Sequence, residues 1–343
     1  MSEIGVLLIS FSLCLIINYI FIKYDFLIDK KFFPHKSFVS QNSVPISGGL
    51  IFILSTLLFL EFKSYFNYII FLIFFVGILS DLNILKSPHK RFILQVTIIL
   101  ILTFLSKNFI SSIRIPLFDH LLTYTFFKYF FVVFCLLILI NGSNFIDGVN
   151  TLLIGYFSSV ILIVNILIYK YSLDFDTQNL NIIFIVLLVI FVFNFFEKFF
   201  CGDSGSYTIS LIVGYFLIEL SNLDLIISPY FIACLLWYPA YECLFSMIRK
   251  KVKKKEVTGP DNNHLHQLLF IFLKKKMKLK GWIISSTTGI LINTYNLGIF
   301  FMAFLNVSQT KILIFIIIFN IFLYNFIYFV LKKKISNSTS LNW

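Results

Sequence analysis

Two aspartates in this sequence stand beside glycines at the ends of long apolar runs, where a membrane-embedded helix would meet water. Asp147 lies in "NGSNFIDGVN" (141–150) and Asp203 in "FFCGDSGS" (199–206). Glycine lets the backbone approach a ligand closely or take a positive φ. A carboxylate pair facing a phosphate favours Mg²⁺, which takes one or two carboxylates, waters and phosphate oxygens. Each motif alone is equally typical of a helix N-cap, so only their combination favours a binding site.

A third polar segment, "SDLNILKSPHKR" (80–91), also follows an apolar run and contains Asp81, Lys90 and Arg91. Arginine and lysine at that depth can hold the phosphate of a lipid headgroup. Plain membrane anchoring by positive charge is an equally good interpretation, so both stay open.

His264 and His266 lie in "GPDNNHLHQLL" (259–269), just after the basic run "RKKVKKKE" (249–256). Two residues apart, they do not form a helical i, i+4 metal pair. We interpret them as loop residues that donate to a phosphate or sugar, with ordinary solvated histidines as the alternative. The basic run either anchors the loop to anionic lipids or attracts a nucleotide. Glu242, inside an apolar run, is a functional candidate because a buried ionisable group is costly.

The elements that must position these residues are membrane-spanning helices. Of the 343 residues, 59% are hydrophobic, and the mean hydropathy is +0.93. Apolar runs suited to a hydrocarbon core about 30 Å thick recur from end to end, whereas the alternating segments of a β-barrel are absent. We predict a single all-α polytopic membrane domain with about eleven spans: 4–22, 46–60, 67–80, 92–106, 125–140, 152–168, 180–196, 206–221, 228–248, 281–304 and 311–331.

The distribution of positive charge predicts the orientation. If loop 23–45 lies inside, 22 of the 28 Lys and Arg residues fall on the cytoplasmic side, as positively charged loops do. The N-terminus is then outside and the C-terminus cytoplasmic. The polar segments described above, together with "SVPISGG" (43–49), all fall on the cytoplasmic face. We therefore expect five segments to converge there on one cleft.

In this order, the five segments resemble the motifs of the polyprenyl-phosphate N-acetylhexosamine-1-phosphate transferase family, also called glycosyltransferase family 4. "PISGG" looks like its P-x-x-GG, and "SDLNILKSPHKRFILQ" like its DD-L…R…Q. "NGSNFIDGVNTL" resembles N-x-x-N-x-x-DG-x-DGL, "CGDSGS" is similar to M-GD-x-GS, and "PDNNHLHQLL" to PD-x-x-H-x-HH. One such motif is weak, but five in order are specific. The resemblance covers about residues 30–280 and leaves the predicted helices in 281–331 as additions.

The resemblance implies transfer of an N-acetylhexosamine 1-phosphate from a UDP-sugar to undecaprenyl phosphate, with UMP as the second product. It implies Mg²⁺ as cofactor, with Mn²⁺ as the alternative, and a site on the cytoplasmic face of a bacterial inner membrane. The product would initiate a cell-envelope glycan. The expected partners are the two substrates and membrane lipids, without nucleic acid; a homodimer stays open.

The resemblance also implies roles for individual residues. Asp203 and Asp147 would be metal ligands. Asp81, His264 and His266 would complete the catalytic set. The implied substrate-binding residues are Asn141, Asn144, Gly148, Val149, Asn150, Phe200, Lys90 and Arg91.

Two positions depart from the family pattern. Ser80 replaces the first of two paired aspartates, and Asn150–Thr151 replaces a second Asp-Gly. The first change puts a general base in doubt. However, a phosphomonoester with a second pKa of about 6 is already largely dianionic at neutral pH. An inactive paralogue, a lipid-linked transporter or flippase, and a scaffold are the alternatives. The sequence specifies neither the sugar nor whether transfer is direct or passes through a phospho-aspartate.

Overall fold

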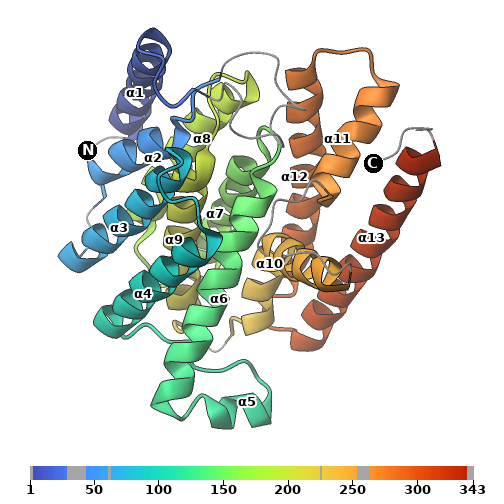
Figure 1. The fold of residues 1–343 in the computed structure, drawn as a ribbon. Coiled ribbons are helices and arrows are strands. Elements are labelled where there is room, and N and C mark those ends of the chain that lie inside the picture. The colour runs from blue at the N-terminus through green and yellow to red at the C-terminus, as the bar shows by residue number, and fades with distance from the viewer. Residues whose placement is uncertain (1–2, 29–43, 61–62, 225, 253–262, 338–343) are drawn as a thin grey trace.

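The computed structural model describes residues 3–28, 44–60, 63–224, 226–252 and 263–337. Within these ranges the chain is helical, apart from turns and one isolated bridge between Ile28 and Pro45. The helices shown in Figure 1 are α1 (Glu3–Lys23), α2 (Gly48–Leu57), α3 (Ser64–Asp81), α4 (Pro88–Ser106), α5 (Pro116–Leu121), α6 (Thr125–Ile146), α7 (Leu152–Tyr171), α8 (Thr177–Phe195), α9 (Gly202–Ser221), α10 (Pro229–Val252), α11 (Leu265–Lys276), α12 (Gly281–Leu305) and α13 (Thr310–Asn337).

This architecture confirms the predicted all-α polytopic class. Among the described residues, nine helices are long and apolar enough to cross a membrane: α1, α3, α4, α6, α7, α8, α10, α12 and α13. Each of the other two predicted spans also contains a helix, but α2 has only 10 residues and α9 is not among the nine. The count of eleven spans and the orientation of the termini stay predictions.

Several predicted boundaries were too short. The span predicted at 125–140 continues to Ile146, and the one predicted at 206–221 begins at Gly202. The third and fourth spans, predicted to be short, have 18 and 19 residues. In each case polar residues interrupt the apolar run near the end of the helix, and a prediction based on apolar runs stops before them.

The prediction that the histidine motif forms a loop was wrong at its second half. His264 is the N-cap of α11, and His266 lies in its first turn. The backbone N–H of His264 donates to the Gln267 side chain at 3.1 Å, which ties the N-cap to the first turn of the helix. Residues 259–262 of the motif, residues 253–256 of the basic run and Ser43 lie outside the described residues.

Helix α9 lies at the centre of the fold and packs against α2, α3, α6 and α7. Glycines allow α2 and α3 to reach its first turn. A Cβ atom at Gly77 would stand 2.3 Å from the Ser204 Cα, and one at Gly49 would stand 2.4 Å from the Gly205 nitrogen. Any larger residue would push these helices away from α9.

The C-terminal helices pack on the other side of the bundle (Figure 1). Helix α12 packs on α7 and α11, while α13 packs on α10 and α11. Helix α10 crosses α6 closely, because a Cβ at Gly142 would stand 2.1 Å from the Pro239 carbonyl oxygen. This crossing brings the second half of α10 beside the polar end of α6.

Candidate active site

The first turn of α9 is the point on which the polar segments converge. Asp81, the last residue of α3, accepts hydrogen bonds from the backbone N–H groups of Asp203 (2.8 Å) and Ser204 (3.0 Å). The carboxylate thus caps α9 from another helix, where the exposed N–H groups and the helix dipole favour negative charge. Gly202 takes φ +76°, and a Cβ there would stand 2.8 Å from the Asp81 carboxylate. The glycine is therefore required for this approach.

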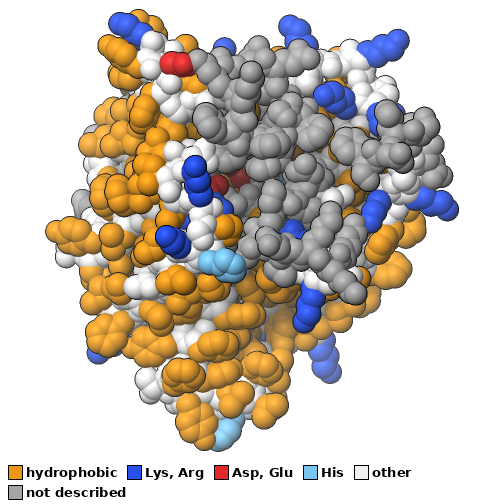
Figure 2. Space-filling model, in the orientation of Figure 1, with side chains coloured by type: hydrophobic (Ala, Val, Ile, Leu, Met, Phe, Trp, Pro, Cys, Tyr) orange, Lys and Arg blue, Asp and Glu red, His pale blue; other side chains and the backbone are white. Residues whose placement is uncertain are grey.

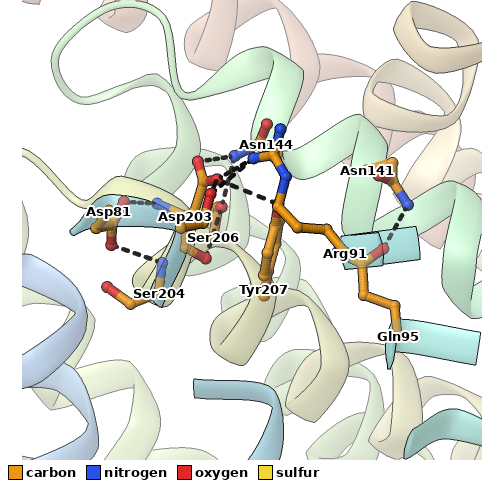
Figure 3. A network of polar contacts seen from close by, with 10 residues as sticks. Asp81, Arg91, Gln95, Asn141, Asn144, Asp203, Ser204, Ser206 and Tyr207 are labelled. Atoms are coloured by element: carbon orange, nitrogen blue, oxygen red, sulfur yellow. Dashed lines mark hydrogen bonds and ion pairs between the residues drawn. The ribbon is translucent and has the colours of Figure 1, made fainter. Parts of the chain in front are cut away.

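Asp203 accepts hydrogen bonds from side chains of four helices, α3, α4, α6 and its own helix α9 (Figure 3). Its Oδ2 accepts from Ser80 Oγ (2.6 Å), Arg91 Nη1 (2.8 Å) and Tyr207 Oη (3.2 Å). Its Oδ1 accepts from Asn144 Nδ2 at 2.6 Å. Arg91 Nη1 also donates to Ser80 Oγ at 2.7 Å. The side chains of Arg91 and Asp203 are 25% and 21% exposed, so this ion pair stays open to an incoming group.

The "PISGG" segment has a structural task. Its backbone pairs with the stretch just before α9: Gly48 N donates to the Phe200 carbonyl (3.0 Å) and Gly49 N to the Cys201 carbonyl (3.1 Å). In return, Phe200 N donates to the Pro45 carbonyl at 2.9 Å. The segment therefore fixes the approach to Asp203. Phe200, which the resemblance places near the nucleotide base, is 6% exposed.

The turn after α6 is tied to both α9 and α11. Asp147 follows the last residue of α6, and its Oδ2 accepts from the Gly202 N–H at 3.1 Å. At Gly148, a Cβ would stand 2.3 Å from His266 Nε2. Val149 is buried. This turn therefore contacts both the segment at 199–206 and the histidine segment at 259–269.

The same turn is supported by α12, which the family resemblance does not cover, and by α8, which it does. Asn150 N donates to Ser285 Oγ of α12 (2.9 Å), and Asn293 of α12 donates to the Thr151 carbonyl (2.9 Å). Thr151 N donates to Asn194 Oδ1 of α8 at 2.6 Å. Thr151 takes φ +67°, a left-handed conformation that is costly for a β-branched residue. The glycine of the family pattern would adopt it without strain, and here the surrounding hydrogen bonds hold Thr151 in it.

Both histidines are buried. The alternative interpretation, ordinary solvated histidines, required them to be exposed. His264 is 4% exposed and His266 fully buried. The rings lie 5.6 Å apart and nearly parallel. Within the described part of the chain, neither ring nitrogen of His266 has a hydrogen-bond partner. Burial lowers the pKa of His266 to about 3, which makes the ring neutral near pH 7.

Of the remaining predicted site residues, Asn141 lies close to the Asp203 cluster, whereas Lys90 makes no contact with it among the described residues. Asn141 donates to Gln95 Oε1 (3.0 Å), one turn of α4 after Arg91, so it lies beside the Asp203 cluster (Figure 3). Lys90 is exposed on α4 and, within the part of the chain that the structure describes, makes no hydrogen bond or ion pair with Asp203. The space-filling view shows acidic side chains in a recess of this face, with Lys and Arg side chains around it (Figure 2).

Sequence reasoning missed several partners. Tyr207 lies one helical turn after Asp203, and this i, i+4 spacing was a usable signal. Ser80 was noted only as a missing aspartate, whereas its hydroxyl links Arg91 to Asp203. Glu242 was singled out without a role. Its Oε2 lies 2.8 Å from His264 Nδ1.

We expect Ser80→Asp to lower turnover about tenfold rather than restore a missing base. The new carboxylate would lie beside Asp203 Oδ2, now 2.6 Å from the serine hydroxyl. Two carboxylates at such a distance repel by a few kcal/mol, and Arg91 offsets only part of this. The measurement is the pH–rate profile of both proteins at the same Mg²⁺ concentration, with Ser80→Ala as the uncharged control. A variant about tenfold faster than wild type at pH 6 would contradict this expectation and restore the base.

Comparison with known proteins agrees with this geometry. The profile of glycosyl transferase family 4 matches residues 64–221, which contain Asp81, Arg91, Asn144, Asp147 and Asp203. The undecaprenyl-phosphate alpha-N-acetylglucosaminyl 1-phosphate transferase of Thermotoga maritima is 27% identical over 276 residues, 80% of this chain and 84% of the relative.

Two further relatives represent related activities. The phospho-N-acetylmuramoyl-pentapeptide-transferase of Dictyoglomus thermophilum is 25% identical, over 72% of this chain and 78% of its own length. A probable undecaprenyl-phosphate N-acetylglucosaminyl 1-phosphate transferase of Bacillus subtilis is 28% identical, over 59% of this chain and 56% of its own length. These similarities support the resemblance to glycosyl transferase family 4, whose profile matches the part of the chain that carries Asp81, Asp147 and Asp203.

Proposed function

We propose that this protein transfers an N-acetylhexosamine 1-phosphate from a UDP-sugar to undecaprenyl phosphate, releasing UMP. The observation that carries the proposal is the Asp203 cluster, a partly exposed carboxylate paired with Arg91 at the polar ends of long apolar helices. Such a place lets a water-soluble nucleotide meet a lipid-borne phosphate. The names of the relatives from Thermotoga maritima and Bacillus subtilis point to the same reaction class.

The overall reaction exchanges one phosphorus–oxygen bond for another. An oxygen of the acceptor phosphate bonds to the phosphorus that carries the sugar, and the bond from that phosphorus to the bridging oxygen breaks. The bridging oxygen leaves with UMP. Such transfers need positioning and neutralisation of charge more than covalent chemistry, and the dianionic acceptor is already a nucleophile near pH 7.

Several residues can supply these functions. Arg91 would hold an acceptor or diphosphate oxygen with its guanidinium group. Asn144 and the turn at Gly148 would hold the nucleotide part. His266 lies beside Gly148, and its two ring nitrogens have no hydrogen-bond partner among the described residues. It therefore offers a buried hydrogen-bonding group to a phosphate or sugar oxygen.

Magnesium is part of the proposal, and the donor set fits it. Among the described residues, no three His, Cys, Asp or Glu side chains are grouped to hold a metal, whereas Mg²⁺ needs only one or two carboxylates when substrate phosphates and waters complete its shell. Asp203 and Asp147 would hold the ion. When bound, it would neutralise charge on the phosphate oxygens.

We place the reaction at the cytoplasmic face of a bacterial inner membrane, because the positively charged loops cluster on that side of the predicted topology. A transporter fits less well, since transporters usually bind substrate at discontinuous helices near the membrane midplane. Here the charged cluster lies at the ends of α3 and α9.

The direct test uses purified protein with undecaprenyl phosphate, Mg²⁺ and a panel of UDP-sugars, without any ion gradient. We expect UMP to form with at least one UDP-N-acetylhexosamine, and only when both the acceptor lipid and Mg²⁺ are present. Omitting each in turn provides the controls. If no member of the panel yields lipid-dependent UMP, the proposal is wrong and the inactive paralogue is favoured.

A further inference from the structure

Glu242 is a fully buried carboxylate in α10 that contacts the histidine motif at the start of α11. Its Oε2 lies 2.8 Å from His264 Nδ1, and its Oε1 accepts from the Leu265 N–H at 3.1 Å. Tyr238, one turn earlier in α10, donates to Oε1 at 3.4 Å. Burying a charge is expensive unless it is paired and hydrogen-bonded, and here three donors surround the group.

These contacts determine which nitrogen of His264 carries the proton. An ionised carboxylate only accepts hydrogen bonds. Because Oε2 faces His264 Nδ1, that nitrogen must be the donor, and the opposite nitrogen, Nε2, is left for another partner. The ring cannot turn freely either, since it lies between Phe145 (5.2 Å between ring centroids) and His266 (5.6 Å).

The same helix also holds the start of α11 in place. Arg249, two turns after Glu242, donates to the Asn263 carbonyl and to Tyr328 Oη of α13 (3.1 Å). Glu242 holds the first N–H group of α11 itself. Since α10 also crosses α6 closely at Gly142, it links the histidines to the segment that carries Asn144 and Asp147.

We propose that Glu242 is a positioning residue, which keeps His264 protonated at Nδ1 and turned so that Nε2 serves the transferred phosphate. The inference rests on the proposed transferase function. The proposal assigns a role to the buried carboxylate of Glu242, which does not itself take part in the transfer reaction. A purely structural ion pair would stabilise the fold without coupling to the histidine's part in turnover.

Glutamine at position 242 separates these two roles. Its carbonyl oxygen can replace one carboxylate oxygen and accept from Leu265 N–H, but its NH₂ group must then face His264 Nδ1. To accept a hydrogen bond from this NH₂ group, Nδ1 must be unprotonated, so the imidazole proton would move to Nε2. Glu242→Gln therefore keeps the volume and the backbone bond while inverting the tautomer. We expect kcat to fall about 10- to 100-fold, as for other partners that orient a functional histidine, with a smaller change in KM for the UDP-sugar.

A double-mutant cycle tests whether Glu242 acts through His264. His264→Gln leaves an NH₂ donor for the buried carboxylate but removes the imidazole. If the proposal holds, adding Glu242→Gln to His264→Gln lowers kcat less than about threefold further, because coupled residues do not add. Trp237→Phe is the matched control. It removes another buried hydrogen bond of α10, to Asn296 (2.9 Å), and its effect should multiply with that of His264→Gln.

The tautomer itself can be measured by NMR of protein labelled with ¹⁵N-histidine, which has five such residues. One histidine, identified by its loss in His264→Gln, should change from Nδ1–H to Nε2–H in Glu242→Gln. An unchanged tautomer, or independent effects in the cycle, would overturn the proposal. If Glu242→Gln does not fold, Glu242→Asp takes its place: it should keep Nδ1–H yet lower kcat, and an unchanged kcat would contradict the positioning role. Failure of the proposed function would look different, because wild type itself would form no UMP while the tautomer change persisted.

Discussion

Asp203→Asn should lower kcat at least about 100-fold while leaving the protein folded. The carboxylate accepts hydrogen bonds from four side chains and carries the charge that pairs with Arg91. Removing a group that organises charge at a reaction centre typically costs 10²- to 10³-fold. The fold should survive, because asparagine can turn its oxygen toward Ser80 and Arg91, and the amide of Asn144 can flip to meet its NH₂.

The measurement is UMP release at saturating Mg²⁺, together with a thermal unfolding curve of the purified variant. Asp174→Asn is the matched control, since it makes the same change at an exposed position between α7 and α8, and it should keep wild-type turnover. If Asp203→Asn retains more than a tenth of wild-type kcat, Asp203 is not the group on which the reaction depends.

The helical class could be predicted from the sequence because length and hydrophobicity alone decide whether a segment can cross a membrane. The helix ends could not. Residues 141–144 of α6 and 202–205 of α9 are polar residues or glycines, so an apolar window stops at them, although their backbone continues the helix. The boundary errors therefore fell on the residues nearest the chemistry.

The convergence of the polar segments could also be predicted, because counting helix crossings places loops on one face or the other. The individual partners could not be. Arg91 and Asp203 are 112 residues apart, and Glu242 and His264 lie on different helices. Which side chains meet depends on the rotation of each helix about its axis, and small residues such as Gly77 and Gly142 set this through close packing. The sequence shows where these glycines are, but it does not show which helix each of them packs against.

The motif identifies Asp81 as a site residue, but only the geometry of the structure indicates its role. The resemblance placed it among the catalytic residues. In the structure it is 5% exposed, and its two oxygens accept from two successive N–H groups of α9. A carboxylate held in this way is poorly placed to take a proton from a substrate. We infer that it positions Asp203.

Asp81→Asn should therefore impair both stability and turnover. Asparagine can offer an oxygen to only one of the two N–H groups and would place its own NH₂ against the other. An unmet buried donor costs about 1–3 kcal/mol, and the favourable charge at the helix start is lost as well. The first turn of α9 would shift and move Asp203, and a misplacement of about 1 Å can cost 10²-fold in rate. We expect a lower unfolding temperature and kcat reduced about 100-fold.

The pH–rate profile distinguishes this positioning role from that of a general base. If Asp81 only caps α9, the profile of the residual activity keeps the wild-type shape at a lower level. If Asp81 accepts the proton, the acidic limb of the profile disappears in Asp81→Asn. Asp176→Asn is the control, because Asp176 caps α8 through the Asn179 N–H (3.2 Å) at the end remote from Asn194. Loss of that exposed cap should lower stability slightly and leave turnover unchanged, since α8 begins far from the carboxylates that the reaction needs.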